Sequence, residues 1–95
     1  MLLEPIMQLE IVAPEEYSPS INADLARRRA EIQQIDMRGN NKVIRTLAPL
    51  SELLGYSTAL RIITSGSATF SLEFSHYQLM TAAVEDKAIY KLKGF

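Results

Sequence analysis

The sequence predicts an α+β domain whose strands and helices follow the order β-α-β-β-α-β. Three observations predict this order: apolar residues alternate near both ends of residues 5–74, they recur at helical spacing in two segments between those ends, and a Gly-Asn-Asn turn divides the chain near its middle. Two βαβ halves joined in this way form a ferredoxin-like sandwich. We therefore expect a four-stranded antiparallel sheet with both helices on one face and the other face open.

The first strand is predicted over residues 5–13. Met7, Leu9 and Ile11 alternate with polar residues, which is the pattern of a strand with one face in the core and one face in water. Pro14 ends this alternation.

The first helix is predicted to follow this strand and to run to about Arg29. Tyr17, Ile21 and Leu25 recur at i, i+4 and i+8, so they form one apolar stripe. Pro19 lacks a backbone N–H, and the helix therefore either holds it in the first turn or begins a little later.

A hairpin is predicted from residues 31–38 and 42–48, with Gly39-Asn40-Asn41 as its turn. The apolar spacing slips by one residue between Ile32 and Ile35, which indicates a bulge in the first of these strands. The polar turn residues then project from the tip of the hairpin.

The second helix is predicted from Pro49 to near Gly66. Its apolar stripe is built from leucines, namely Leu50, Leu53, Leu54 and Leu60. Ser51 is the candidate N-cap, and Gly55 is a weak point that would let a neighbouring backbone come close.

The fourth strand is predicted where Phe70, Leu72 and Phe74 alternate with polar residues. With this strand we expect a domain over residues 1–77. Residues 78–95 are predicted to form a C-terminal tail that contains at most a short helix.

Length and composition limit the classes of function. The 95 residues suffice for one domain with a single modest core, and 47% hydrophobic with 22% charged residues is ordinary for a globular fold. The chain has no cysteine, which excludes disulfides, a thiolate nucleophile and Cys-based zinc sites. Its net charge of -1 argues against a surface that grips nucleic acid non-specifically, so any RNA contact must be a local patch.

No segment indicates a membrane or an export signal. No apolar run approaches the roughly 20 residues of a membrane span, and the N-terminus lacks the pattern of a signal peptide. The first residues lead at once into strand-like sequence. We expect the chain to begin at a domain boundary inside a longer protein, to be monomeric and to have no membrane partner.

Catalytic motifs are missing from the sequence, and we expect this chain not to be an enzyme by itself. No GxxxxGK[ST] phosphate loop occurs. His76 is accompanied by no GxSxG nucleophile elbow, and we interpret it as a surface or tail-packing histidine. A lone histidine builds no metal site, and we expect no cofactor in this chain.

The run Arg27-Arg28-Arg29 at the end of the first helix is one candidate binding feature. At about 100° per residue, the three side chains point in different directions. Arg28 falls on the apolar stripe, where we expect it to pair with Asp24 and to be structural. Arg27 and Arg29 are predicted to diverge into solvent. For a solitary domain, a solvated helix end explains these two slightly better than a ligand site does.

Two loops form the other candidate feature. The residues are Arg38, Asn40, Asn41 and Lys42 at the hairpin tip, and Ser65, Gly66 and Ser67 in a small-residue loop that we expect to offer free backbone amides. Such groups suit phosphate oxygens and RNA edges. Tight turns also favour asparagine and glycine on their own account, so this signal alone is weak.

Several blocks of the sequence, in order, resemble the last domain of elongation factor G, usually numbered five. The blocks are EPIMQLEIVAPEEY, DLARRRAEIQQIDMRGNNKVI, PLSELLGYSTALR and SLEFSHY. The stretch TSGSATFSLEFSHYQLM resembles the mitochondrial ribosome-releasing paralogue most closely, because bacterial translocases more often carry a charged glycine loop. The resemblance covers nearly all of residues 4–77.

The resemblance implies a function in translation. In such factors an N-terminal G domain hydrolyses GTP with magnesium, and the last domain docks near the stalk base and the GTPase-associated RNA of the large subunit. The releasing paralogue acts with ribosome recycling factor to split mitochondrial ribosomes after termination, in the mitochondrial matrix. The implied partners are large-subunit RNA, a stalk-base protein, ribosome recycling factor and the other domains of the parent chain.

The resemblance also marks the ribosome-facing candidates. They are Arg27, Arg29, Arg38, Asn40, Asn41, Lys42, Arg61, Ser65, Gly66 and Ser67. Ala30 stands where the family frequently has glycine after the arginines, which places a left-handed turn at that position in doubt.

Other functions stay open. The chain would also suit a translocating elongation factor G, or a small-ligand regulatory module of the same fold that binds an effector at a sheet edge or a dimer interface and requires dimers. A ferredoxin-like hydrolase or a base-stacking RNA platform is disfavoured, because no phosphate loop precedes a helix and the middle strands hold no exposed aromatic residues.

Overall fold

The computed structural model describes residues 2–79. The elements, in order, are β1 (Leu3–Pro14), a 3-10 turn η1 (Glu15–Tyr17), α1 (Ser18–Arg27), β2 (Glu31–Arg38), β3 (Asn41–Pro49), a second 3-10 turn η2 (Leu50–Leu53), α2 (Tyr56–Ile63) and β4 (Thr69–Leu79). No helix in this part of the chain is long and apolar enough to cross a membrane.

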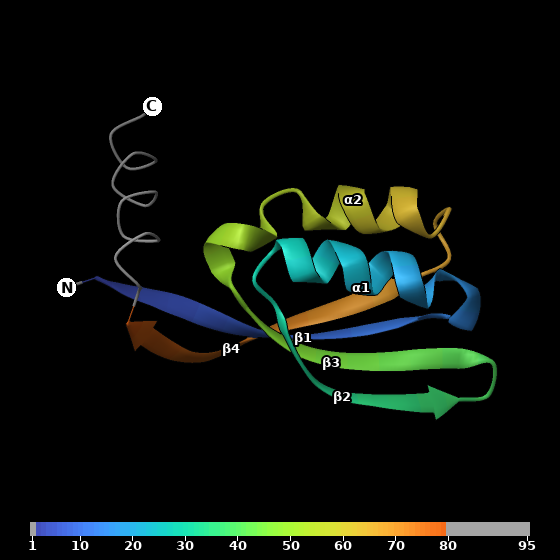
Figure 1. Cartoon of the computed structure of the whole chain (residues 1–95), viewed down its shortest axis with the longest axis horizontal. Helices are drawn as coiled ribbons and strands as arrows, with labels where there is room; N and C mark the ends of the chain where they lie inside the picture. The colour runs from blue at the N-terminus through green and yellow to red at the C-terminus, as the bar shows by residue number, and fades with distance from the viewer. Residues whose placement is uncertain (1, 80–95) are drawn as a thin grey trace.

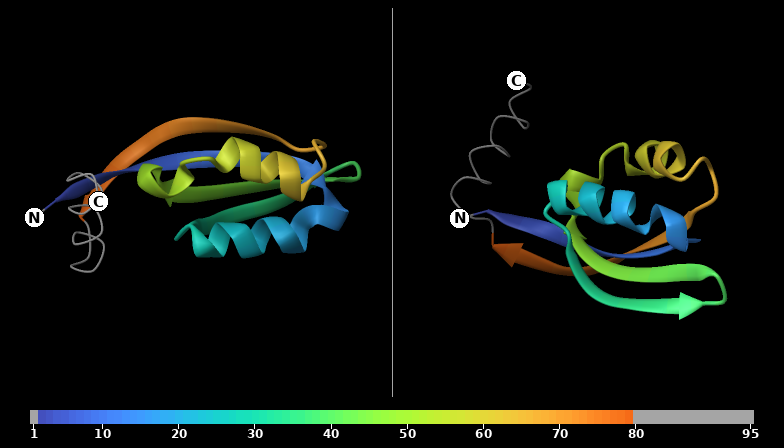
Figure 2. Two further views of the ribbon diagram at one scale, coloured as in Figure 1. Left: turned by 90° about the horizontal axis from the view of Figure 1, so that it is seen from above. Right: turned by 45° about the vertical axis from the view of Figure 1, so that its right-hand side comes forward.

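The four strands form one antiparallel sheet with the order β2-β3-β1-β4. Both helices lie on the same face of this sheet (Figures 1 and 2). This is the predicted ferredoxin-like sandwich, because each helix connects two strands that are not adjacent in the sheet.

The core lies between the helices and the two central strands. Leu9 and Ile11 of β1 are fully buried, together with Ile44 of β3. Residues of both helices close the core from above, namely Ile21 and Leu25 of α1 and Tyr56 and Leu60 of α2. The predicted stripe of the first helix therefore faces the sheet, with Tyr17 packed at its margin.

The β2–β3 hairpin follows the sequence prediction closely. Its turn consists of Gly39 and Asn40, because Arg38 pairs with Asn41 across the strands. Gly39 has φ 64°, a value that favours glycine. The register of β2 shifts between Ile32 and Gln34, which confirms the predicted bulge.

The first helix ends earlier than predicted. It begins at Ser18, with Pro19 in its first turn as expected, but its last residue is Arg27 and not Arg29. Arg29 has φ 58°, and its N–H donates to the Ala26 carbonyl while the next N–H donates to Leu25. This pair of bonds is a Schellman motif, which normally uses glycine at the left-handed position. The left-handed turn therefore exists, but it lies at Arg29, one residue before Ala30.

The second helix is not continuous, which corrects the prediction. A 3-10 turn ends at Leu53, Leu54 is extended, and Gly55 has φ 71° at the start of α2. Leu54 is consequently exposed and does not belong to an apolar stripe, and Ser51 makes no capping hydrogen bond. A Cβ at Gly55 would meet nothing within 4 Å, so its glycine serves the left-handed backbone and not a close approach.

β4 is an edge strand that continues through Leu79, two residues beyond the predicted domain boundary. Its apolar residues Phe70, Leu72 and Phe74 stay partly exposed. The predicted tail from residue 80 onward, with its short helix, lies outside the described residues.

Candidate functional site

The predicted binding residues lie at two opposite ends of the domain and do not form a single cluster. The hairpin tip and the loop before β4 share one end, because β1 pairs Pro14 with Asn41 on one side and Val12 with Thr69 on the other. We call this the hairpin end. α1 runs away from the hairpin end and carries Arg27 and Arg29 to the other one (Figure 1).

The hairpin tip is polar and anchored to the start of the first helix. The backbone N–H of Glu15 donates to the Asn40 carbonyl at 3.4 Å, and Lys42 Nζ lies 3.4 Å from Ser18 Oγ. Arg38 and Asn41 are exposed, and their side chains have no partner among residues 2–79. Arg38 is therefore a cation on a fixed turn with its charge available to a ligand.

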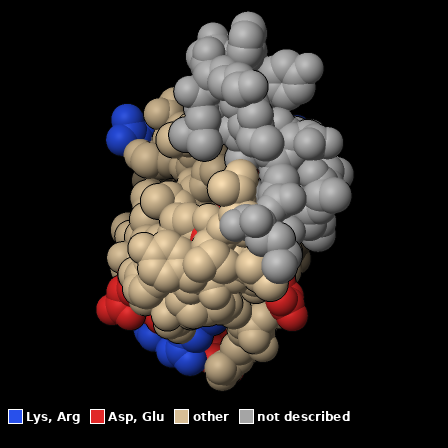
Figure 3. All heavy atoms as spheres, turned by 90° about the vertical axis from the view of Figure 1, so that its left-hand side faces the viewer, with Lys and Arg blue, Asp and Glu red and all other residues tan. Residues whose placement is uncertain are grey.

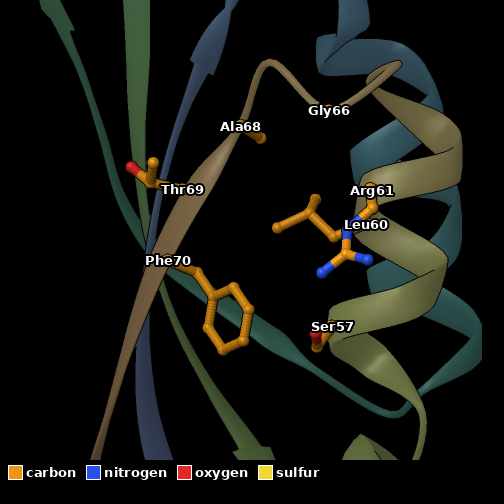
Figure 4. Close-up of a pocket in the computed structure, with 7 residues that line it drawn as sticks. All are labelled: Ser57, Leu60, Arg61, Gly66, Ala68, Thr69 and Phe70. Carbon is orange, nitrogen blue, oxygen red and sulfur yellow. The ribbon is translucent and has the colours of Figure 1, made fainter.

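Arg61 stands at the same end, on the exposed side of α2. It lies at the rim of a groove of about 470 Å³ between α2 and β4 (Figure 4). Its guanidinium makes no ion pair within the described part of the chain. Arg61 and Arg38 are thus two unpaired cations that belong to the hairpin end.

The loop from Ser65 to Ser67 does not offer free amides, contrary to our expectation. The N–H of Ser65 donates to Ile62, that of Gly66 to Arg61 at 2.8 Å, and that of Ser67 to Thr64 at 3.0 Å. Ser65 has φ 52°, so these bonds form a second Schellman motif at the end of α2. The amides satisfy the carbonyls of the helix end and are not available to bind phosphate.

Replacing Ser65 with glycine is expected to raise the free energy of unfolding by about 1 kcal/mol. A non-glycine residue in the left-handed region costs roughly this amount, and glycine removes the cost without removing a backbone bond. Urea denaturation of the chain measures the change. The matched control is Gly66→Ala, which places a Cβ at φ 80° and should be destabilising. A Ser65→Gly variant that is less stable than the parent would contradict this account of the loop.

The arginine run at the opposite end separates into three environments. Arg27 pairs with Asp24 at 2.8 Å, but its side chain remains 77% exposed. Arg28 also pairs with Asp24, at 2.9 Å, donates to the Glu52 carbonyl and lies 5.0 Å from the centre of the Tyr56 ring. The prediction that Arg28 is structural and pairs with Asp24 is confirmed.

Arg29 is not directed into solvent, which corrects the prediction. Its Nη1 and Nη2 donate to the two carboxylate oxygens of Glu4 at 3.2 and 2.9 Å, and its Nε lies 3.5 Å from a Glu52 oxygen. The Glu4 side chain is only 3% exposed, and that of Arg29 is 34% exposed. The hydrogen bond with Glu4 raises the pKa of Arg29. The sequence held no signal for Glu4, which stands before the predicted first strand.

The described surface at the end that carries the arginine run is not basic. Figure 3 looks at this end, and most of its described surface belongs to residues that are neither acidic nor basic, with small separate groups of either charge. This agrees with the ion pairs, which neutralise much of the positive charge locally. Arg38 and Arg61 of the hairpin end, whose side chains have no partner among residues 2–79, are therefore the stronger candidates for a ligand.

The described residues hold no group of three or more histidine, cysteine, aspartate or glutamate side chains that could bind a metal. His76 is exposed, as predicted, and its Nδ1 lies 2.8 Å from the hydroxyl of its neighbour Ser75. The central strands β1 and β3 carry no aromatic residue, so they offer no stacking platform for bases.

Comparison with known proteins bears on the fold and the family of the chain. The family model described as elongation factor G C-terminus matches residues 1–88. A crystal structure of a protein from Thermus thermophilus is similar to this chain with a TM-score of 0.86 and 32% sequence identity over 98% of the chain. The chain spans 14% of the length of that protein.

Proposed function

Because the chain belongs to the elongation factor G C-terminal domain family, we propose that it is a docking domain through which a translational GTPase contacts the large ribosomal subunit. The family match carries this proposal. The domain supplies binding, while GTP and magnesium are held by a G domain elsewhere in the parent protein. Its partners are large-subunit RNA, a stalk-base protein and the other domains of the parent.

The hairpin end is the proposed contact with RNA. Arg38 is exposed and unpaired among the described residues, and the turn that holds it is fixed by the Asn40 carbonyl and by Lys42. Arginine side chains and amide groups on such a fixed tip suit phosphate and sugar oxygens. Arg27 remains a second, weaker candidate because its charge is shared with Asp24. Arg29 is a poor candidate because Glu4 occupies its guanidinium.

Replacing Arg38 with alanine is expected to weaken binding of the chain to large ribosomal subunits and to flatten the salt dependence of binding by about one unit of slope. Each phosphate contact contributes approximately this amount through release of bound ions. Co-sedimentation with purified large subunits over a series of salt concentrations measures both quantities.

The matched control is Arg45→Ala, which removes the same charge from the centre of the sheet. Arg45 is already paired with Glu10 at 3.2 Å and lies away from the hairpin end. The proposal for the tip fails if both variants bind as the parent chain does, or if they lose affinity equally.

At finer detail, we propose that the parent is the mitochondrial ribosome-releasing form, which splits subunits with ribosome recycling factor in the mitochondrial matrix. The resemblance of residues 64–80 to that paralogue supports this assignment. A translocating elongation factor G is the alternative. The test measures subunit splitting and translocation by the parent protein that contains this domain. Splitting of mitochondrial ribosomes only with recycling factor, without translocation, would support the releasing form. Translocation without splitting would support the alternative.

A further inference from the structure

A groove runs between α2 and the edge strand β4. It consists of two hollows of about 470 and 170 Å³ that share Ser57 and Phe70. In Figure 4 the side chains of Leu60 and Phe70 project into the larger hollow from opposite sides, and Arg61 reaches over it from the helix. The smaller hollow is mainly apolar, with Leu9, Leu53 and Leu72 in its lining.

The floor of the groove is the margin of the hydrophobic core, where apolar side chains reach the solvent. Phe70 and Leu72 of β4 pair with Ile11 and Leu9 of β1, and residues that pair directly share one face of the sheet. They therefore lie on the helix side, yet each is about two-fifths exposed. α2 leaves these two side chains partly uncovered, and the apolar area that remains would be buried by an added side chain.

The outer edge of β4 completes the groove as a binding site. In the described part of the chain, β4 pairs with β1 alone, so its other side presents backbone N–H and C=O groups in a row. An extended peptide that pairs with this edge would place every second side chain on the helix side, over the hollows. The backbone then supplies affinity and the hollows supply selectivity.

The charge of the groove is positive. Arg61 is its only charged lining residue, and its guanidinium has no partner among residues 2–79. A carboxylate on the bound segment would pair with it. RNA is less well suited, because the lining holds a single cation for phosphates and the Phe70 ring packs edge-on against Tyr56 with 5.7 Å between centroids.

We propose that this groove binds an extended, acidic segment of a partner protein, which adds to the edge of β4 as a fifth strand of the sheet. Alternate apolar side chains of the segment occupy the two hollows, and a carboxylate pairs with Arg61. The site differs from the hairpin tip in its ligand, because it recognises backbone and apolar side chains and not phosphate.

The test uses a capped synthetic peptide of about six residues, the usual length of a strand, in which valine alternates with threonine and one end is glutamate. Titrated into isotope-labelled chain, it should shift the amide signals of residues 57–61 and 68–72. Two further peptides carry N-methyl groups on the odd or on the even residues. Because alternate residues of an added strand face β4, one of these peptides should bind and the other should lose at least tenfold in affinity.

Charge recognition is tested with Arg61→Gln, which should lower the affinity for the glutamate peptide by up to about fivefold and leave that for a glutamine version unchanged. Arg38→Gln is the matched control, and it should bind both peptides as the parent chain does. The proposal is overturned if the peptide shifts no groove amides, if both N-methylated peptides behave alike, or if an RNA oligonucleotide shifts the same amides and displaces the peptide. No ribosome is needed, so this result is independent of the docking function.

Discussion

An Arg29→Glu variant is expected to be less stable than the parent chain by about 3–5 kcal/mol, or to fail to fold. The substitution leaves the buried Glu4 carboxylate without its counter-ion and sets a second negative charge beside it. Removing one partner of a buried ion pair costs roughly this much, because the remaining charge is neither hydrated nor paired. Urea denaturation followed by circular dichroism measures the loss.

Arg27→Glu is the matched control, two residues earlier on the same helix end. Its side chain is mostly exposed, and the buried Asp24 keeps its second ion pair, with Arg28 at 2.9 Å, so the expected loss is below about 1 kcal/mol. Equal urea midpoints for the two variants would contradict the structural role assigned to Arg29. A second variant, Arg29→Gln combined with Glu4→Gln, removes both charges and should recover part of the stability.

The contrast decides how ribosome binding is tested. A reversal of charge at Arg29 would weaken binding through unfolding even if the residue never touches RNA. Substitutions at Arg27 and Arg38 change the surface charge without this complication.

A Leu9→Ala variant is expected to lose about 3 kcal/mol of stability. Leu9 is fully buried at the centre of the sheet, and residues of both helices pack with it in the core. The cost combines the lost burial of the side chain with the cavity that remains. Leu9 also lines the smaller hollow of the groove, so the new cavity opens toward it.

Leu72→Ala is the matched control, because Leu72 pairs directly with Leu9 on the neighbouring strand. Its side chain is 41% exposed, so the expected loss is only about 1 kcal/mol. The same urea experiment compares the two. If Leu72→Ala lowers the free energy of unfolding as much as Leu9→Ala does, then the groove is closed in solution. That result would contradict the proposal that the groove binds a peptide.

Features that depend on local patterns could be predicted from the sequence. The alternation in β1, the slip between Ile32 and Ile35, and the spacing of Asp24 and Arg28 each need only a few neighbouring residues. The structure shows the slip and the pair, and it shows the alternation from Leu9 onward. Before Leu9 the buried positions shift by one residue to Glu4 and Ile6, so the predicted core residue Met7 is only half-buried. The order of elements and the fold class follow from the sum of such patterns.

Features that depend on distant residues could not be predicted. Arg29 turns inward because Glu4, 25 residues away, lies buried beneath it. The break at Gly55 could not be predicted from the four leucines before and after it. Their helical spacing is compatible with one continuous helix and also with two shorter helical segments. The prediction of free amides in the loop at Ser65 is wrong because these N–H groups donate to carbonyl groups at the end of α2. The composition of the loop does not indicate these hydrogen bonds.

The ion pair between Arg29 and Glu4 constrains the length of the chain between β1 and β2. One residue inserted into the last turn of α1 would rotate the following side chains by about 100° around the helix axis. The Arg29 guanidinium would then lose the two hydrogen bonds that it donates to the Glu4 carboxylate. A deletion there would act in the same way with the opposite sense. We therefore expect insertions and deletions at this connection to destabilise the chain by separating Arg29 from Glu4.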